Sequence, residues 1–265
     1  MNKVTTTKLI DMKKNGKKIT ALTCYSYSIA RMLNKTNVDI MLVGDSVGMV
    51  ELGYENTLPV TVQEMIHHTK AVKRANPGAL LITDMPYMSY NIEDKETLRI
   101  AGGFIKEGGA EGVKLEGGKP IINTVKMLVD NNVPVMGHLG LTPQSIHKFG
   151  GYKVQGKSEK QADEILAEAK MLEDAGIFSL VLEGMPAELA KKITESLSVP
   201  TIGIGAGPDC DGQILVINDM LGMDLSFKPK YVRRYANLEE SVIEAVKKYC
   251  DDVVEGKFPS EEESY

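Results

Sequence analysis

Residues 112–140, GVKLEGGKPIINTVKMLVDNNVPVMGHLG, decide the fold class of this chain. Gly112–Leu115 and Pro134–Gly137 are short apolar runs without polar alternation, which is typical of strands that are buried on both faces. The segment between them, Lys119–Asn131, repeats its apolar residues at helical spacing. A strand, a helix and a second strand in this order predict two parallel strands joined by a crossover helix.

The same alternation extends along the chain on both sides of this unit. The other predicted strands are Thr20–Thr23, Ile40–Val43, Leu80–Thr83, Leu180–Leu182, Thr201–Ile204 and Ile214–Ile217. The other predicted helices are Thr5–Lys14, Val62–Ala75, Leu98–Glu107, Glu159–Asp174, Pro186–Leu197 and Leu238–Cys250. Eight strands in this order predict an α/β fold, a single eight-stranded βα (TIM) barrel, with a doubly wound open sheet as the alternative. The connection from Gly205 to Gln213 is too short and Gly-rich for a full helix, so we expect that unit to be irregular.

We expect one domain over residues 1–265. Its predicted parts are an N-terminal helix and lead-in over 1–19, the barrel over 20–250 and an acidic tail over 251–265. A length of 265 residues, with 43% hydrophobic and 25% charged residues, suits one globular domain of this kind. The formal net charge of −5, with scattered Lys and Arg, gives no electrostatic footprint for nucleic acid.

The cysteine pattern and the N-terminal sequence indicate a cytoplasmic protein. Cys24, Cys210 and Cys250 are an odd number without metal-type spacing, which favours a reducing compartment over a disulfide framework. The first residues contain no long apolar run, so we expect neither a signal peptide nor a membrane anchor.

Polar residues follow the predicted strands at one end of the barrel. They are Asp45 and Ser46 after the second strand, Asp84 after the third, Lys114 and Glu116 at the fourth, His138 at the fifth and Glu183 at the sixth. In parallel α/β folds the catalytic residues collect beyond the carboxyl ends of the strands. Because scattered surface charge would not select one end of a sheet, this set predicts an active site there.

Two aspartates of this set predict a site for a hard divalent cation. Neighbouring parallel strands lie about 4.8 Å apart, so Asp45 and Asp84 can approach one ion from two strand ends. Lys114 and Glu116 are two residues apart and would point to the same face. Oxygen ligands without paired cysteines or histidines favour Mg²⁺ over zinc. The alternative is that both aspartates are helix N-caps.

Glu183 and His138 also have two interpretations each. A partly desolvated carboxylate at a barrel mouth can act as a general base, but Glu183 could equally cap the helix that begins near Pro186. His138 could hydrogen-bond a substrate or orient a carboxylate, or it could be a core histidine that is satisfied by the backbone.

Eight segments occur in the order of a known family. They are LVGDSVGMVELGYENTLPVT, DMPYMSY, GVKLEGG, PVMGHLGLTPQS, GGYKVQGK, TIGIGAG, CDGQILV and NDMLG. From about residue 20 to residue 240 the chain thus resembles the 3-methyl-2-oxobutanoate (ketopantoate) hydroxymethyltransferase family. One departure is visible, because the family usually reads close to TAYDY where this chain has TCYSY at residues 23–27. Ser26 therefore replaces an acid, which we expect to affect a loop contact rather than the reaction.

The resemblance implies a barrel of the phosphoenolpyruvate/pyruvate type that assembles as a homodecamer. It implies one Mg²⁺ per subunit and methylenetetrahydrofolate as the co-substrate. The reaction would transfer a hydroxymethyl group to 3-methyl-2-oxobutanoate through a Mg-stabilised enolate, giving ketopantoate for pantothenate and coenzyme A biosynthesis. The implied roles are metal binding for Asp45, Asp84 and Glu116, substrate binding for Asp45, Ser46, Asp84, Lys114 and His138, and proton removal for Glu183.

Two other functions compete with this interpretation. A Mg²⁺-dependent 2-oxoacid lyase or a phosphoenolpyruvate mutase would use the same carboxylates, together with a reactive cysteine or a further acid on a mobile loop. The sequence offers no convincing candidate for either group. A non-catalytic barrel that only binds a metabolite would be expected to lack part of the charged set, all of which is present.

Overall fold

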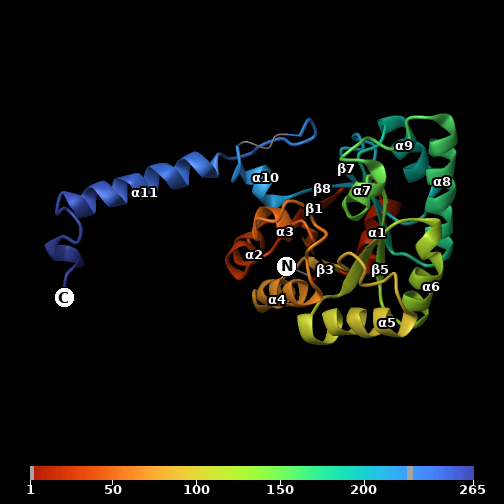
Figure 1. The fold of residues 1–265 in the computed structure, drawn as a ribbon, viewed down its shortest axis with the longest axis horizontal. Coiled ribbons are helices and arrows are strands. Elements are labelled where there is room, and N and C mark those ends of the chain that lie inside the picture. Colours follow the sequence, from red (N-terminus) through yellow and green to blue (C-terminus); the bar gives the residue numbers. More distant parts are fainter. Residues whose placement is uncertain (1–2, 226–228) are drawn as a thin grey trace. The chain divides into compact units, whose positions relative to one another are not determined.

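The computed structural model describes residues 3–225 and 229–265, so residues 1–2 of the predicted lead-in lie outside the described part. Within this part, eight parallel strands form a closed barrel in sequence order, and β8 pairs with β1 (Figure 1). The strands are β1 (Ile19–Thr23), β2 (Ile40–Val43), β3 (Leu80–Asp84), β4 (Gly112–Glu116), β5 (Val135–Gly140), β6 (Ser179–Glu183), β7 (Thr201–Ile204) and β8 (Gly212–Leu215). The predicted barrel is therefore confirmed, and the open sheet is excluded.

The strands are apolar runs because both of their faces are covered. Every residue of β2, β3, β4 and β7 is buried, as expected for parallel strands between a packed interior and a layer of helices. A core cluster joins strand residues around the barrel to Leu9, which is fully buried in the first helix, α1 (Thr6–Lys14). Lys13 of the same helix forms a 2.7 Å ion pair with Asp211, directly before β8, so α1 packs at the amino end of the strands.

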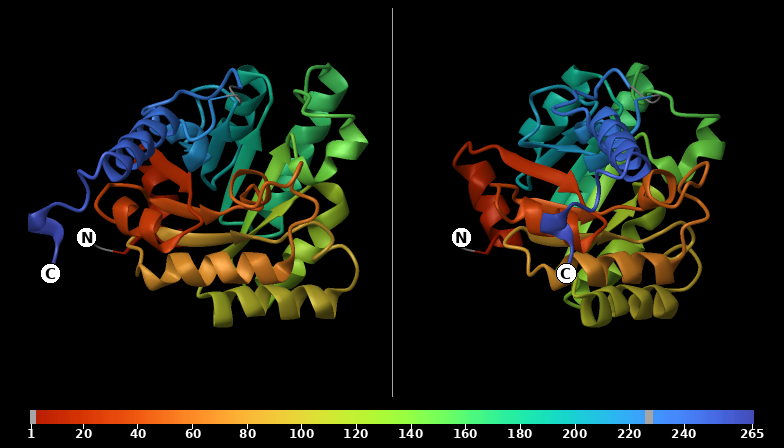
Figure 2. Two further views of the ribbon diagram at one scale, coloured as in Figure 1. Left: turned by 60° about the vertical axis from the view of Figure 1, so that its left-hand side comes forward. Right: turned by 90° about the vertical axis from the view of Figure 1, so that its left-hand side faces the viewer.

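Helices connect most of the strands. In the barrel unit they are α2 (Tyr27–Leu33), α3 (Val47–Val50), α4 (Val62–Arg74), α5 (Asp94–Gly103), η1 (Phe104–Gly108), η2 (Lys119–Ile121), α6 (Ile122–Asp130), η3 (Pro143–Ser145), α7 (Ile146–Phe149), α8 (Glu159–Asp174) and α9 (Ala187–Ser196). Figure 2 shows the orange α4 and the yellow α5 side by side outside the strands. No helix is described between β7 and β8, which confirms the irregular connection that the sequence predicts.

The structure adds elements that periodicity did not predict. The short helices α2, α3 and α7 follow strands β1, β2 and β5 at the end of the barrel where the polar residues lie. The helix predicted over Leu98–Glu107 starts earlier, at Asp94, and its last turn is the π-helix η1. The last predicted strand is also shifted, because β8 ends at Leu215 and Ile217 already belongs to a helix.

By its internal contacts the chain forms two compact units, residues 1–216 with the whole barrel and residues 217–265. The second unit contains α10 (Ile217–Leu221), α11 (Leu238–Val254) and η4 (Glu261–Glu263). Helix α11 runs through Val254, past the predicted end at Cys250, because Gly256 is the first residue with a positive φ (+68°) to end it. None of the described helices combines the length and the apolar character needed to cross a bilayer.

Candidate active site

The carboxyl ends of β2 to β5 bring five of the predicted residues into one buried cluster. The strand register places Asp84 beside Lys114 and Glu116 beside His138. Asp45 follows β2 and completes the cluster. Each of the five residues is at most 6% exposed to solvent. Charged side chains thus lie in the barrel interior toward the carboxyl ends of strands that are otherwise largely apolar.

Asp45 and Asp84 are held together by the backbone. The Asp45 N–H donates to Asp84 Oδ2 at 3.0 Å. The other oxygen, Asp84 Oδ1, accepts no hydrogen bond of acceptable geometry from the described residues, although Lys114 Nζ lies 3.2 Å away. Burial raises the pKa of both carboxyl groups, and in Asp45 the charge of Asp84 raises it further. The negative charge of the two carboxylates is therefore not fully balanced by the neighbouring ammonium of Lys114.

Lys114 lies among the three carboxylates as an ammonium. Its Nζ is 3.2 Å from Asp84 Oδ1 and 3.7 Å from Glu116 Oε1. Burial opposes this charge, but the carboxylates, Asp84 foremost, outweigh burial and raise the pKa of Lys114 above its ordinary value. Lys114 therefore stays charged in a site that excludes water.

His138 connects the cluster to Glu183. Its Nδ1 is 3.4 Å from Glu116 Oε1 and 3.2 Å from Lys114 Nζ, and its Nε2 is 3.2 Å from Glu183 Oε2. Burial and Lys114 lower the pKa of His138, but the two glutamates outweigh them and raise it to about 9. The Glu183 side chain is 14% exposed, so it lies where the buried cluster meets the mouth of the barrel. His138 thus lies between Glu116 and Glu183.

Ser46, which precedes α3, is half-buried, and its Oγ lies 2.7 Å from the hydroxyl of Tyr25. Ser26 has a different role, because its Oγ accepts the Ile29 N–H as the N-cap of α2. Aspartate and serine both serve as N-caps, so the departure from the family pattern falls on a helix start.

Three side chains of the site were missed by sequence reasoning: Tyr25, Tyr90 and Gln144. Tyr25 contacts Ser46, and Tyr90 contacts Gln144 and the Glu116 backbone. Gln144 in turn contacts the carboxylates of Asp45 and Glu116. All three lie in quoted stretches, namely TCYSY, DMPYMSY and PVMGHLGLTPQS. Tyr90 and Gln144 lie in the connections that follow β3 and β5. Looking for polar residues directly at strand ends therefore does not identify them.

The donor set fits a hard divalent cation. It consists of carboxylate oxygens, one of which, on Asp84, is buried without a hydrogen bond. No three His, Cys, Asp or Glu side chains of the described residues have the spacing of metal ligands. Asp45 and Asp84 could therefore bind an ion directly and leave its other positions to water and substrate oxygens, with Glu116 further out.

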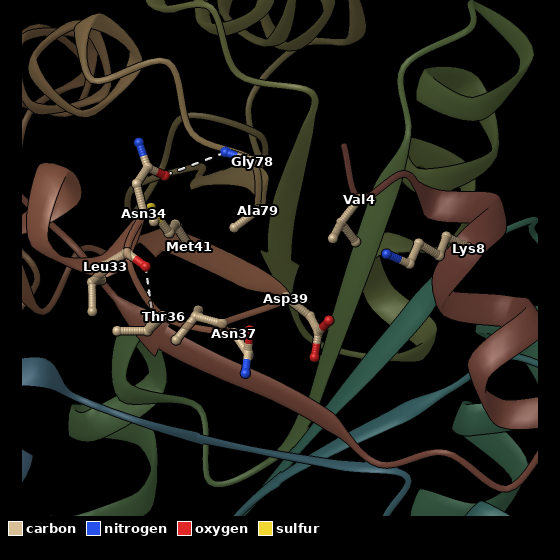
Figure 3. A pocket seen from close by; sticks show the side chains of 11 residues that line it. Val4, Lys8, Leu33, Asn34, Thr36, Asn37, Asp39, Met41, Gly78 and Ala79 are labelled. Carbon is tan, nitrogen blue, oxygen red and sulfur yellow. Dashed lines mark hydrogen bonds between the residues drawn. The ribbon is translucent and has the colours of Figure 1, made fainter. Parts of the chain in front are cut away.

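A separate cavity of about 300 Å³ lies at the opposite end of the barrel (Figure 3). It is lined by residues directly before β2 and β3, such as Asp39 and Gly78, and by Lys8 of α1. The Asn34 side chain accepts the Gly78 N–H there at 3.3 Å. Lys8 and Asp39 are the titratable groups of its lining, so it lacks the cluster that catalysis would need.

The fold and this site define the class of the protein. The structure of 2,3-dimethylmalate lyase, a PEP mutase/isocitrate lyase superfamily member, is similar with a TM-score of 0.62 at 14% identity, over 98% of this chain and 91% of that one. This likeness shows the fold alone, a βα barrel, as the sequence predicts.

Sequence relatives identify the family within this class. The family model for ketopantoate hydroxymethyltransferase matches residues 3–261. The 3-methyl-2-oxobutanoate hydroxymethyltransferases of Syntrophomonas wolfei and of a Thermoanaerobacter species are 54% and 56% identical to this chain. The matches cover 100% and 99% of this chain and 96% of each relative. The chain belongs to the ketopantoate hydroxymethyltransferase family and is a transferase, which confirms the resemblance read from the sequence.

Proposed function

We propose that the chain transfers a hydroxymethyl group from methylenetetrahydrofolate to 3-methyl-2-oxobutanoate with the help of one Mg²⁺ per subunit. The product is ketopantoate, for pantothenate and coenzyme A biosynthesis. Family membership and the names of the relatives support the reaction. The main support for a metal-dependent reaction is the buried pair of Asp45 and Asp84. Their negative charge exceeds the positive charge that Lys114 supplies.

Asp45 and Asp84 would hold the ion, and Glu116 would support it from a greater distance. When bound, Mg²⁺ would polarise the keto group of the oxoacid and acidify the neighbouring C–H. Ser46 and Lys114 would bind the oxoacid carboxylate with a hydroxyl and an ammonium that the fold already places beside the aspartates. Because the site is buried, the charge of Lys114 is screened little and also stabilises negative charge that develops as the proton leaves.

Glu183 would remove the C3 proton of the oxoacid. It is the carboxylate at the boundary between the cluster and the mouth, and its Oε2 lies 3.2 Å from His138 Nε2. The resulting enolate would form a C–C bond with the one-carbon unit of the folate, and both C–N bonds to that carbon would break. A water molecule would supply the hydroxyl oxygen of ketopantoate, and its two protons and the proton held by Glu183 would go to the new hydroxyl group and to the two nitrogens of tetrahydrofolate. His138 would hydrogen-bond the substrate or keep Glu183 oriented toward it.

The chain would act as a homodecamer in the cytoplasm. The exposed apolar residues of α11 support assembly, since no residue of this helix is buried within its own compact unit. The three cysteines are free, which suits a reducing compartment.

The test is product formation from 3-methyl-2-oxobutanoate, with methylenetetrahydrofolate and Mg²⁺ each present or withheld. We expect ketopantoate only when both are present, measured by mass spectrometry. Ketopantoate formed equally well in the presence of EDTA would overturn the metal assignment. Mg²⁺-dependent turnover of another oxoacid or of phosphoenolpyruvate, without ketopantoate, would favour a lyase or mutase instead.

A further inference from the structure

Gln144 makes contacts with three strand ends at once. It lies in η3, after β5, and is 7% exposed. Its Nε2 donates to Asp45 Oδ2 at 2.8 Å and to the Met85 carbonyl at 3.0 Å. Its backbone N–H donates to Glu116 Oε2 at 3.0 Å. One residue of the fifth connection thus joins the ends of β2, β3 and β4.

The acceptor oxygens around Nε2 determine which way the Gln144 amide faces, and Tyr90 supports that orientation. The Tyr90 hydroxyl lies 2.6 Å from Gln144 Oε1 and donates to it. With the amide reversed, its oxygen would face the acceptor oxygens of Asp45 and Met85, and its NH₂ would face the hydroxyl. Tyr90 and Gln144 are both buried, and an unsatisfied buried polar group costs about 1–3 kcal/mol. The amide is therefore fixed with its N–H groups toward Asp45.

These contacts leave each acid of the cluster with one oxygen bound to a neutral N–H. Asp45 Oδ2 accepts from the Gln144 side chain, Glu116 Oε2 accepts from the Gln144 backbone, and Asp84 Oδ2 accepts from the Asp45 backbone. Among the residues that the structure describes, the second oxygen of Asp84 accepts no hydrogen bond of acceptable geometry and lies 3.2 Å from Lys114 Nζ. The second oxygen of Glu116 faces Lys114 and His138. A carboxylate fixed through one oxygen presents the other in a set direction.

We propose that Gln144, supported by Tyr90, is a positioning residue for the cation site. It holds Asp45 and Glu116 so that one oxygen of each faces the place between the carboxylates. It touches neither substrate nor metal itself, and it acts through the acids that do. The inference rests on the proposed metal-dependent function and deepens it. Outer partners of this kind commonly change metal affinity by about 10–100-fold when they are removed.

The test is Mn²⁺ binding to the purified protein, with free Mn²⁺ measured by electron paramagnetic resonance and Mg²⁺ used as a competitor. We expect Gln144→Leu to raise the Kd for Mn²⁺ by about 10–100-fold. Tyr90→Phe, which keeps the ring and removes only the hydroxyl, is expected to raise the Kd in the same direction by a smaller factor. The second variant keeps the test decisive even if Gln144→Leu folds poorly, and melting curves in EDTA show which variants are folded.

Gln155→Leu is the matched control. Gln155 lies in the same connection and is also 7% exposed, but its amide contacts Lys153 and Gln161 rather than an acid of the cluster. Its Kd for Mn²⁺ is expected to equal that of the wild type. Wild-type affinity in folded Gln144→Leu or Tyr90→Phe would overturn the positioning role alone. Absence of Mn²⁺ binding in the wild type would overturn the proposed metal function, and this inference with it.

Discussion

At the scale of one residue, Asp45 shows how the site lowers the folding stability of the metal-free protein. Burial is the main reason that its pKa lies well above the ordinary value, and the charges of Asp84 and Glu116 add to it. The folded chain therefore binds this proton more tightly than the unfolded chain does. The stabilising contribution is present below the unfolded pKa, near 3.8, and is lost as the pH rises through the higher folded pKa.

Asp45→Asn is therefore expected to melt at a higher temperature than the wild type in EDTA at pH 8, and the difference should shrink at pH 5. Gln144 can still donate to the new amide oxygen, so its contact is kept. Mg²⁺ at 100 times its Kd should stabilise the wild type by about 2.7 kcal/mol and leave the variant unchanged. Thermal melts with EDTA or Mg²⁺ measure both effects, and Asp163→Asn, exposed on α8, is the control. An equal Mg²⁺ shift in Asp45→Asn would place the ion elsewhere.

The charged residues of the site could be predicted because each stands where an apolar run stops. Asp84, Glu116 and Glu183 are examples, since each is the last residue of its strand. Gln144 could not be predicted in this way. It lies beyond β5 in a loop whose path depends on tertiary packing, and a glutamine in a loop carries no signal of the oxygens that it will contact.

The strands and helices also differ in how far the sequence predicts them. The strand positions followed from composition, and the bounds of β2 and β7 agree with those predicted. The short helices α2, α3 and α7 could not be predicted from the sequence, because four to seven residues are too few to show a helical period. Their starts depend on local hydrogen bonds such as the Ser26 cap. The π-turn η1 follows α5 without any interruption that the sequence would reveal.

Gly140 shows how closely β5 and β6 must approach for Glu183 to reach its place. It pairs with Glu183 in the register, and its φ is +96°. A Cβ at this position would lie 2.2 Å from the Glu183 carbonyl oxygen and 2.8 Å from the Met185 methyl group. The end of β6 would have to shift in order to accept a methyl group.

Gly140→Ala is expected to lower the free energy of unfolding by about 1–3 kcal/mol, as overpacking and an unfavourable φ do. It should also slow the exchange of the C3 proton of 3-methyl-2-oxobutanoate in D₂O, which proton NMR follows, because Glu183 moves with its backbone. Gly102→Ala in helix α5 is the control, since its Cβ would meet no atom within 4 Å. That change should be neutral or stabilising by roughly 0.5–1 kcal/mol. Wild-type exchange in Gly140→Ala would show that proton removal does not depend on this approach.

At the scale of the whole molecule, the subunit surface includes α11, of which no residue is buried within its own compact unit. Its exposed apolar residues are Val242, Ile243, Val246, Tyr249, Val253 and Val254. Most of them recur at spacings of three and four residues, so they share one side of the helix. Each Å² of apolar surface in water costs about 25 cal/mol, and contiguous patches of this kind mark interaction sites. A second copy of this chain is the occupant that the proposed homodecamer supplies.

Val246→Lys is therefore expected to reduce the assembled mass, because burying a lysine charge in an apolar interface opposes association. Val246 is near the centre of the apolar side and is 54% exposed in the single chain, so the change should leave the melting of an isolated subunit nearly unaffected. Size-exclusion chromatography with light scattering measures the mass. Glu244→Lys introduces the same side chain on the opposite side of α11 and should assemble as the wild type does. If Val246→Lys keeps the wild-type mass at low protein concentration, α11 is not part of the subunit interface, and its apolar side has another partner.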